Sequence, residues 1–279
     1  MPISRPTDVT ATLDALAASP DADLLAGGTD LVVEVNLDRR RPEHVIALRR
    51  VTELAGHDTT DGRLRLGANV TYSEVEHDLA QLVPGLAMAA RTVGSPQIRN
   101  AGTLGGNLGT ASPAGDTLPW LLAMDAEVEL ASPEGNRSVP LANFLTGPKS
   151  TARRPAELIT GVRLPRVEGP QHVSKIGPRN AMVISVACFA IVLDTTNRRV
   201  RTGMGAVGPT VLRSPDAEHA VTQALDWDAL TCPEDAIDAF GRACAEATAP
   251  ITDHRSSAEY RRHAVGVLAR RALRRCLST

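Results

Sequence analysis

Two pairs of adjacent glycines, far apart in the chain, place the strongest constraint on what this sequence can form. They are Gly27-Gly28 and Gly105-Gly106, each beside an apolar segment. Adjacent glycines allow positive φ and let backbone N–H groups converge on an anion with no Cβ in the way, which suits phosphate or diphosphate. Side-chain donors stand at the same places: Thr29, Thr103 and Asn107. Either loop alone could be an ordinary tight turn, but two such loops favour a bound diphosphate.

Length, composition and charge narrow the class of protein. A chain of 279 residues predicts one or two domains, and 43% hydrophobic residues are enough to fill a core. The formal charge is −2, from 30 basic and 32 acidic side chains, so nothing indicates a polyanionic partner. Only 3% of the residues are aromatic, which leaves few stacking platforms for single-stranded nucleic acid. We therefore expect no nucleic-acid partner.

The sequence shows no segment that would insert into a membrane. Its longest nearly apolar run, residues 181–193, is shorter than the roughly 20 residues that a spanning helix needs. The first residues contain no apolar core of a signal peptide. We therefore expect no membrane span and a cytoplasmic location.

Metal and hydrolytic chemistry have little support. No histidine occurs in H-x-x-H and no serine in G-x-S-x-G. The four cysteines never approach the C-x-x-C spacing of zinc or iron–sulfur ligands: Cys188, Cys232, Cys244 and Cys276. We expect reduced, packed cysteines and no metal site in this chain.

Two other glycine segments resemble nucleotide motifs without meeting their requirements. Residues 203–208 match G-x-G-x-x-G, but Pro209 follows at once, whereas the dinucleotide motif needs its last glycine in the first turn of a helix. Residues 147–150 lack the Gly-Lys dipeptide of a P-loop. We expect neither segment to bind a nucleotide.

Helix and strand signals alternate through the first half of the chain, as they do in α/β and α+β domains. Thr71 and Glu74 form a capping box, and Asp116, taken alone, is expected to cap the helix that follows it. The other expected helices cover residues 8–18, 30–37 and 117–124, and the expected strands cover residues 23–26, 44–48, 64–68 and 126–131.

Prolines and a glycine at residues 165–170 predict a domain boundary. Beyond it we expect strands at residues 173–179, 184–193 and 200–207, followed by three helices. Ser256 and Glu259 are expected to open the last helix as a capping box. One face of that helix carries Arg270, Arg271, Arg274 and Arg275. Such a face is either a solvated surface or a docking face for an acidic partner.

Taken together, these motifs resemble a known family, the FAD-binding subunits of the xanthine dehydrogenase and carbon monoxide dehydrogenase group of molybdenum hydroxylases. Both glycine loops match the pattern of this family. So do four other segments in the same order, at residues 111–116, 175–179, 205–210 and 257–262. The similarity runs from about residue 5 to residue 277.

The resemblance implies an α+β fold in two domains. Residues 1–168 would form a two-lobed FAD-binding domain of the vanillyl-alcohol-oxidase-like (PCMH) type, with lobes at about residues 1–54 and 55–168. Residues 169–279 would form a smaller α+β domain with an antiparallel sheet and helices, of the carbon monoxide dehydrogenase flavoprotein C-terminal type.

The resemblance also implies a set of site residues. Lys175 would hold the flavin ring, where a cation can stabilise the electron-rich reduced form, and Ile184 would lie against one face of the ring. Asp116 would bond a ribose, and Ile159 would offer a main-chain contact. The diphosphate would be wrapped by Leu25, Ala26, Gly27, Gly28, Thr29, Asp30 and Leu31 together with Thr103, Leu104, Gly105, Gly106 and Asn107.

Two positions depart from the pattern of the family. Relatives often carry an aspartate just before the flavin-face residue, where this chain has Met182-Val183, and some place an aromatic near Val93. An acid beside the ring affects its potential and the approach of a nicotinamide. The departures therefore bear on reactivity with NAD and leave FAD binding untouched.

The resemblance further implies partner subunits, because this chain has neither cysteine ligands for a 2Fe–2S centre nor the length for a molybdopterin domain. It would be the medium subunit of a heterotrimer or of a dimer of trimers, with a molybdopterin-binding large subunit and a 2Fe–2S small subunit. Electrons would pass from iron–sulfur centres through FAD to NAD, a quinone, another carrier or dioxygen. The alternatives are a stand-alone FAD-dependent oxidoreductase acting on NAD(P)H or a small organic substrate, and a non-catalytic FAD-binding or assembly protein.

Overall fold

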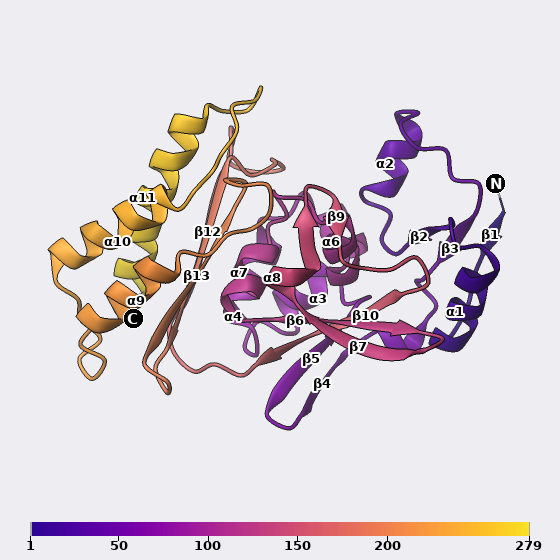
Figure 1. The fold of residues 1–279 in the computed structure, drawn as a ribbon, viewed down its shortest axis with the longest axis horizontal. Helices are drawn as coiled ribbons and strands as arrows, with labels where there is room; N and C mark the ends of the chain where they lie inside the picture. The colour runs from indigo at the N-terminus through magenta and orange to yellow at the C-terminus, as the bar shows by residue number, and fades with distance from the viewer. Residues whose placement is uncertain (1, 279) are drawn as a thin grey trace.

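The first lobe is built on a small parallel sheet at one end of the molecule (Figure 1). A computed structural model describes residues 2–278. In this lobe the strand order is β1-β3-β2. The side chain of Asp8 caps α1 by accepting from the backbone N–H of Ala11 at 2.7 Å, which fixes where this helix begins. The elements are β1 (Ile3–Ser4), α1 (Val9–Ala18), β2 (Asp23–Leu25), α2 (Leu31–Asn36), β3 (Val45–Ala47) and the 3-10 helix η1 (Thr52–Leu54).

The second lobe is a five-stranded sheet of order β4-β5-β10-β6-β7, in which every neighbouring pair is antiparallel. It occupies the middle of the molecule (Figure 1). Its strands are β4 (His57–Thr60), β5 (Arg63–Gly67), β6 (Glu127–Ser132), β7 (Gly135–Pro140) and β10 (Leu158–Pro165), with the small pair β8 (Leu145–Gly147) and β9 (Ser150–Thr151) beside them. Its helices are α3 (Tyr72–His77), α4 (Pro84–Arg91), α5 (Pro96–Ala101), α6 (Leu104–Thr110), α7 (Leu118–Ala123) and α8 (Leu141–Phe144).

The glycine-dense segment 94–109 is more regular than its composition suggests, because it contains the two helices α5 and α6. Ser95 caps α5 by accepting from Ile98, and Thr103 caps α6 by accepting from the N–H of Gly106 at 3.0 Å. These side-chain acceptors satisfy the first free N–H groups of each helix. Local capping thus outweighs the low helix propensity of the glycines.

The C-terminal part is an antiparallel sheet of order β11-β12-β13 covered by three helices. This agrees with the predicted α+β fold. The helices lie at the opposite end of the molecule from the first lobe (Figure 1). The elements are β11 (Gln171–Ile176), β12 (Ala187–Asp194), β13 (Arg199–Gly205), α9 (Pro215–Ala224), α10 (Glu234–Glu246) and α11 (Ala258–Leu277).

Two local predictions in this part need correction. The strand expected from Ile184 begins at Ala187, because residues 177–186 form a loop. The last helix is capped by Ser257, which accepts from the N–H of Tyr260, and not by Ser256, whose own N–H bonds to Asp253. The 203–208 motif lies in β13 and the turn after it, as expected for a segment that does not open a helix.

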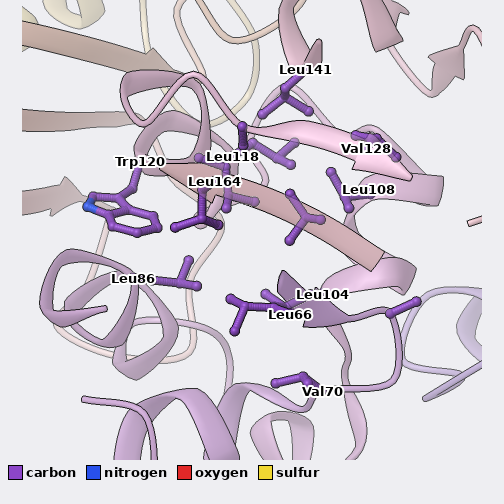
Figure 2. Close-up of a cluster of buried hydrophobic side chains, with 14 of the residues drawn as sticks. Leu66, Val70, Leu86, Leu104, Leu108, Leu118, Trp120, Val128, Leu141 and Leu164 are labelled. Atoms are coloured by element: carbon purple, nitrogen blue, oxygen red, sulfur yellow. The ribbon is translucent and has the colours of Figure 1, made fainter. Parts of the chain in front are cut away.

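Two apolar clusters meet at β12, whose residues are all buried. Cys188, Ala190 and Val192 join the cluster that spans the first and second lobes, which also holds Trp120 and Leu104 (Figure 2). The alternate residues Ala187, Phe189, Ile191 and Leu193 join the cluster formed with helices α9 to α11. A strand buried on both faces in this way, with side chains alternating between them, fastens the C-terminal sheet to the second lobe.

Among the helices of residues 2–278, none combines the length and apolar character that a membrane crossing requires.

Candidate functional site

Both glycine loops face one cavity, of about 290 Å³, between the first and second lobes. The structure therefore brings together segments that lie far apart in the sequence. Twelve of the predicted cofactor-binding residues line this cavity: Leu25, Ala26, Gly27, Gly28, Thr29, Asp30, Leu31, Thr103, Gly105, Gly106, Asn107 and Ile159.

The first glycine loop follows β2 and presents unpaired backbone donors. Gly28 has φ +73°, a left-handed conformation that favours glycine. In the part of the chain that the structure describes, no hydrogen bond satisfies the N–H groups of Gly27, Gly28, Thr29 or Asp30. Backbone N–H groups are rarely left unpaired unless solvent or a ligand accepts them. Several in succession form a nest that suits a diphosphate.

The second glycine loop differs from the first, because its N–H groups are already engaged. Those of Gly105 and Asn107 bond to the carbonyl oxygens of Ala68 and Thr103 at 2.8 and 3.0 Å, and that of Gly106 bonds to the cap. The expectation of converging free N–H groups therefore holds for the first loop only. The second loop instead gives the cavity a wall in which Gly105 and Gly106 add no side chains.

The glycines also serve the packing of the chain. A Cβ added to Gly27 would lie 1.9 Å from the carbonyl oxygen of Ala101, so only glycine lets the first lobe approach the second here. A Cβ on Gly105 would lie 2.6 Å from that of Ala68. Around Gly106 the nearest atom is Thr103 Oγ1 at 3.1 Å, which makes this position the more tolerant of the second pair.

Asp116 and Lys175 form a buried ion pair outside the lining of this cavity. Lys175 Nζ lies 2.6 Å from Asp116 Oδ2 and donates to the carbonyl oxygen of Thr92 at 3.1 Å. The Ser185 hydroxyl donates to Asp116 Oδ1 at 2.6 Å. Asp116 is therefore not the helix cap expected from the local sequence. Burial raises the pKa of Asp116, although Lys175 and Ser185 act in the opposite direction.

Tyr72 links the cavity to this ion pair. Its ring lines the cavity, and burial raises its pKa, with further increases from the negative charges of Asp116 and Asp30. The hydroxyl therefore lies within electrostatic reach of both carboxylates. Sequence analysis missed Tyr72, since only the neighbouring capping box marked this segment.

Two other predicted residues lie away from the cavity wall. Leu104 is a core residue, 1% exposed, and its side chain joins the cluster around Trp120 (Figure 2). Ile184 is 52% exposed on the loop before β12, next to the exposed Met182. A side chain available at the surface beside Ser185 is compatible with a contact to a planar ring.

Cationic side chains at the cavity form a group that the sequence did not reveal. Lys149 lies in the β8–β9 turn, which sequence analysis had considered only as a P-loop candidate, and it pairs with Glu34 of α2. Arg153 lines the cavity and donates to the carbonyl oxygen of Glu157 at 2.7 Å. Arg40 completes this group and pairs with Asp23. None of the three belongs to a motif with recognisable spacing.

Among residues 2–278, no group of three or more His, Cys, Asp or Glu side chains is placed to hold a metal ion. Three of the cysteines are buried: Cys188, Cys244 and Cys276. Burial raises the pKa of Cys188, Cys244 and Cys276, which keeps these thiols protonated.

Two family models divide the chain between them. One, described as the FAD-binding domain in molybdopterin dehydrogenase, matches residues 1–167. The other, described as the carbon monoxide dehydrogenase flavoprotein C-terminal domain, matches residues 172–276. With the fold and the site, these matches define the protein as an FAD-binding oxidoreductase subunit.

Comparison with individual relatives identifies the family more specifically. The xanthine dehydrogenase FAD-binding subunit of Escherichia coli is 31% identical over 94% of this chain and 90% of its own length. The carbon monoxide dehydrogenase medium chain of Afipia carboxidovorans is 33% identical over 91% of this chain and 88% of its own. A carbon monoxide dehydrogenase structure from Hydrogenophaga pseudoflava superimposes with a TM-score of 0.90 at 27% identity, covering 100% of this chain and 97% of its counterpart. The chain belongs to the family of FAD-binding medium subunits of molybdenum hydroxylases.

The residues present fit FAD. Four unpaired N–H groups of residues 27–30 are arranged for a diphosphate, and Arg153 and Lys149 offer positive charge at the same cavity. The glycines of α6 (Gly105, Gly106 and Gly109) leave part of the opposite wall without side chains. The buried Lys175 and the exposed Ile184 supply a charged and an apolar group beyond this cavity.

Proposed function

We propose that this chain receives electrons from iron–sulfur centres of a partner subunit and passes them through FAD to an external acceptor. The partners would be a molybdopterin-binding large subunit and a 2Fe–2S small subunit, in a heterotrimer or a dimer of trimers. The acceptor would be NAD, a quinone, another carrier or dioxygen.

One observation carries this proposal: the chain has a site for a flavin and no side-chain group that could hold a metal centre within residues 2–278. FAD, when bound, exchanges electrons singly or in pairs and so connects one-electron centres with two-electron acceptors. The substrate chemistry and the metal centres then belong to other chains. In keeping with this, several relatives are themselves named as the medium chain or medium subunit of a larger enzyme.

The roles that we propose for the residues follow from their positions. Residues 27–30 would bind the diphosphate through their free N–H groups, and Ile159 would contribute a main-chain contact. Lys175 would place its positive charge beside the ring, with Asp116 holding its ammonium group. Ile184 would cover one face of the ring.

The predicted division at residue 168, with two lobes before it, is part of this proposal. The first two sheets would form the FAD-binding domain, and β11 to β13 with the last three helices would form the C-terminal domain. The arginine face of α11 does not require an acidic partner, because Arg270 and Arg274 already pair with Asp238 and Glu234 of α10.

The stand-alone alternative keeps the same flavin site and removes the partners. The exposed Met182, two residues before Ile184, puts an apolar side chain in the stretch where the resemblance would place an acid, so a ligand other than a nicotinamide is compatible with this loop. Under this alternative the chain alone would turn over NAD(P)H or a small organic substrate.

The first experiment purifies the chain, identifies the released flavin after denaturation, and titrates the protein anaerobically with NADH while recording absorbance. Bleaching of the flavin bands identifies a nicotinamide-reactive site within this chain. Bound FAD that NADH does not reduce indicates a different acceptor or a site completed by partners. Absence of flavin would contradict the proposal.

Partners are tested by tagging the chain in its native cells and analysing the purified material. We expect co-purification of two further chains together with iron and molybdenum. A Gly28→Val variant tests whether assembly depends on flavin. Gly28 has a φ of +73°, which disfavours any side chain, so this variant is expected to lose the flavin. Purification of flavin-loaded chain alone, with steady turnover of NAD(P)H, would favour the stand-alone enzyme.

A further inference from the structure

We infer that Arg261 of α11 and Ser185 are positioning residues for the flavin site. This inference rests on the proposed function, which places Lys175 and Ile184 beside the flavin. Arg261 lies far from both in the sequence, and nothing in its motif identifies a target. The structure shows that one buried guanidinium holds two strand ends that lead to the Asp116 ion pair.

Ser185 is the first point of attachment. It is 1% exposed, whereas its neighbour Ile184 is largely exposed, so the chain turns inward between these two residues. Its hydroxyl donates to one oxygen of Asp116 at 2.6 Å, while Lys175 lies 2.6 Å from the other. The orientation of the carboxylate, and with it the ammonium group of Lys175, therefore depends on where Ser185 stands.

Arg261 fixes the residue next to Ser185. Its guanidinium is buried, and Nη1 donates to the carbonyl oxygen of Val186 at 2.9 Å. The same nitrogen donates to the carbonyl oxygen of Ala206, also at 2.9 Å. A planar guanidinium with several donors in a fixed fork suits this bridging, and a lysine could not reproduce it.

Ala206 leads to the other side of the ion pair. Its N–H donates to the carbonyl oxygen of Pro113 at 2.7 Å, and Pro113 belongs to the short turn that carries Asp116. Ala206 has φ +63°, a conformation that a non-glycine residue keeps only where its surroundings hold it. Arg261 thus holds two segments beside Asp116. Through Val186 it holds the segment that carries Ser185, and through Ala206 it holds the turn that contains Pro113.

The second terminal nitrogen of Arg261 is anchored as well. Nη2 lies 2.7 Å from Asp253, whose carboxylate also accepts from the N–H groups of Arg255 and Ser256. Partial burial acts to raise the pKa of Asp253, but these hydrogen bonds and the charge of Arg261 together lower it to about 2. The carboxylate stays ionised at neutral pH, so Arg261 keeps its counter-charge.

A purely structural role of Arg261 would change only the stability of the protein, whereas a positioning role would also change the properties of the bound flavin. The experiment distinguishes these two roles. The variants Arg261→Gln, Arg261→Lys and Ser185→Ala are purified with their flavin, and Arg262→Gln, altered at the exposed neighbour, is the matched control. For each protein we measure the FAD dissociation constant, the flavin midpoint potential, the visible circular dichroism of the flavin and the thermal midpoint.

We expect Arg261→Gln and Ser185→Ala to weaken FAD binding about tenfold, equivalent to about 1.4 kcal/mol, and to shift the potential and the circular dichroism. Arg261→Lys should recover part of these changes, since one carbonyl contact survives, and Arg262→Gln should match the wild type. If the Arg261 variants do not fold, Ser185→Ala provides the same test, because Ser185 contacts Asp116 directly.

A lower thermal midpoint with unchanged potential, dichroism and FAD affinity would overturn the inference and leave Arg261 a structural residue. That outcome would not affect the proposed function, because the wild type would still bind FAD. A wild type without FAD would instead contradict the proposed function, whatever the variants do.

Discussion

The chain has two internal junctions, and they are built in opposite ways. At the lobe junction, between the sheet of β1 to β3 and the second lobe, Gly27 touches the backbone of Ala101 and a cavity lies alongside. The side-chain links across it include the Glu34–Lys149 pair, with Lys149 63% exposed, and a 3.4 Å hydrogen bond from Thr110 to Asp30. The side-chain amide of Asn69 also donates to the carbonyl oxygen of Leu48 at 2.8 Å.

The sheet junction, between the second lobe and β11 to β13, is closely packed. Gly203 packs so tightly that a Cβ would lie 1.8 Å from the carbonyl oxygen of Pro119. Trp120 donates to the side chain of Gln171 at 2.9 Å, and the ion pair of Asp116 with Lys175 is buried.

The difference shows that close backbone approach serves two purposes in one chain. At the sheet junction, glycine allows layers to share one apolar cluster, which fixes their relative position. At the lobe junction, where Leu16, Ile46 and Leu54 also join one apolar cluster with the second lobe, glycine allows a close backbone contact while unpaired N–H groups remain available beside it. A site for an extended dinucleotide thus forms at the lobe junction, where the packing leaves a cavity. The neighbouring sheet junction is closely packed.

The largest effect is expected from breaking the buried ion pair. Lys175→Met should destabilise the protein by about 3–5 kcal/mol in urea unfolding, because it leaves the carboxylate of Asp116 buried without its cation. The double variant Asp116→Asn with Lys175→Met should recover much of this loss. A loss below about 1 kcal/mol would show that the sheet junction does not depend on the pair.

The same variant should show a pH dependence. Burial already raises the pKa of Asp116, and loss of Lys175 removes the largest influence that opposes this rise. A carboxyl group with a raised folded-state pKa causes no loss below its unfolded pKa, and the loss grows as pH rises toward the folded value. Lys175→Met should therefore be closer to the wild type at about pH 5 than at about pH 8.

The next effect concerns the contact point of the lobe junction. Gly27→Ala should lower stability by about 1–3 kcal/mol, because the new Cβ displaces the backbone of Ala101, and FAD should be lost. Gly147→Ala is the control, since Gly147 has no positive φ and an added Cβ would meet only the Cβ of Ser150, at an ordinary 3.8 Å. Flavin content and thermal unfolding distinguish the two. Equal retention of FAD would mean that the lobes can separate without harm to the site.

A smaller change in stability should accompany Gly106→Ala. Alanine favours the helical conformation of α6 by about 0.5–1 kcal/mol, which offsets crowding against the Thr103 hydroxyl. Stability should therefore stay near that of the wild type while FAD affinity falls, because a methyl group enters the cavity wall. Flavin titration of the apoprotein checks this, and unchanged affinity would place the cofactor away from this wall.

The smallest effect is expected at the rim of the cavity. Glu34→Gln should change stability by about 0.5 kcal/mol or less, because its partner Lys149 is largely exposed to solvent. Lys149→Gln and the double variant complete a double-mutant cycle, measured at low and at high salt. A coupling well above 1 kcal/mol would show that the lobe junction is held more firmly than its geometry indicates.

Much of the fold could be predicted from local sequence. The helix after Asp8, the capping box of Thr71 and Glu74, and the three strands and three helices of the C-terminal part follow from caps and periodicity. The last helix was misplaced by one residue because Ser256 and Ser257 are both good caps. Only the hydrogen bond from Ser256 to Asp253 decides between them.

The candidate site was predicted less completely. Glycine pairs mark backbone without side chains, so the cavity wall was visible in the sequence. Tyr72, Lys149 and Arg153 were missed, because single side chains on unrelated elements meet only after folding. Asp116 was assigned to a cap from the residues alone, since its partners Lys175 and Ser185 lie on another sheet and in the loop that follows it.

The sequence by itself determined the class of cofactor and the kind of backbone that receives it, because glycine pairs and caps act within a few residues. The tertiary structure alone decided that the first glycine pair has free N–H groups and the second does not. It also decided that Arg261 bonds the carbonyl oxygens of two strand ends beside Asp116. The physical reason is that hydrogen bonds and burial between distant segments depend on packing, which no local pattern encodes.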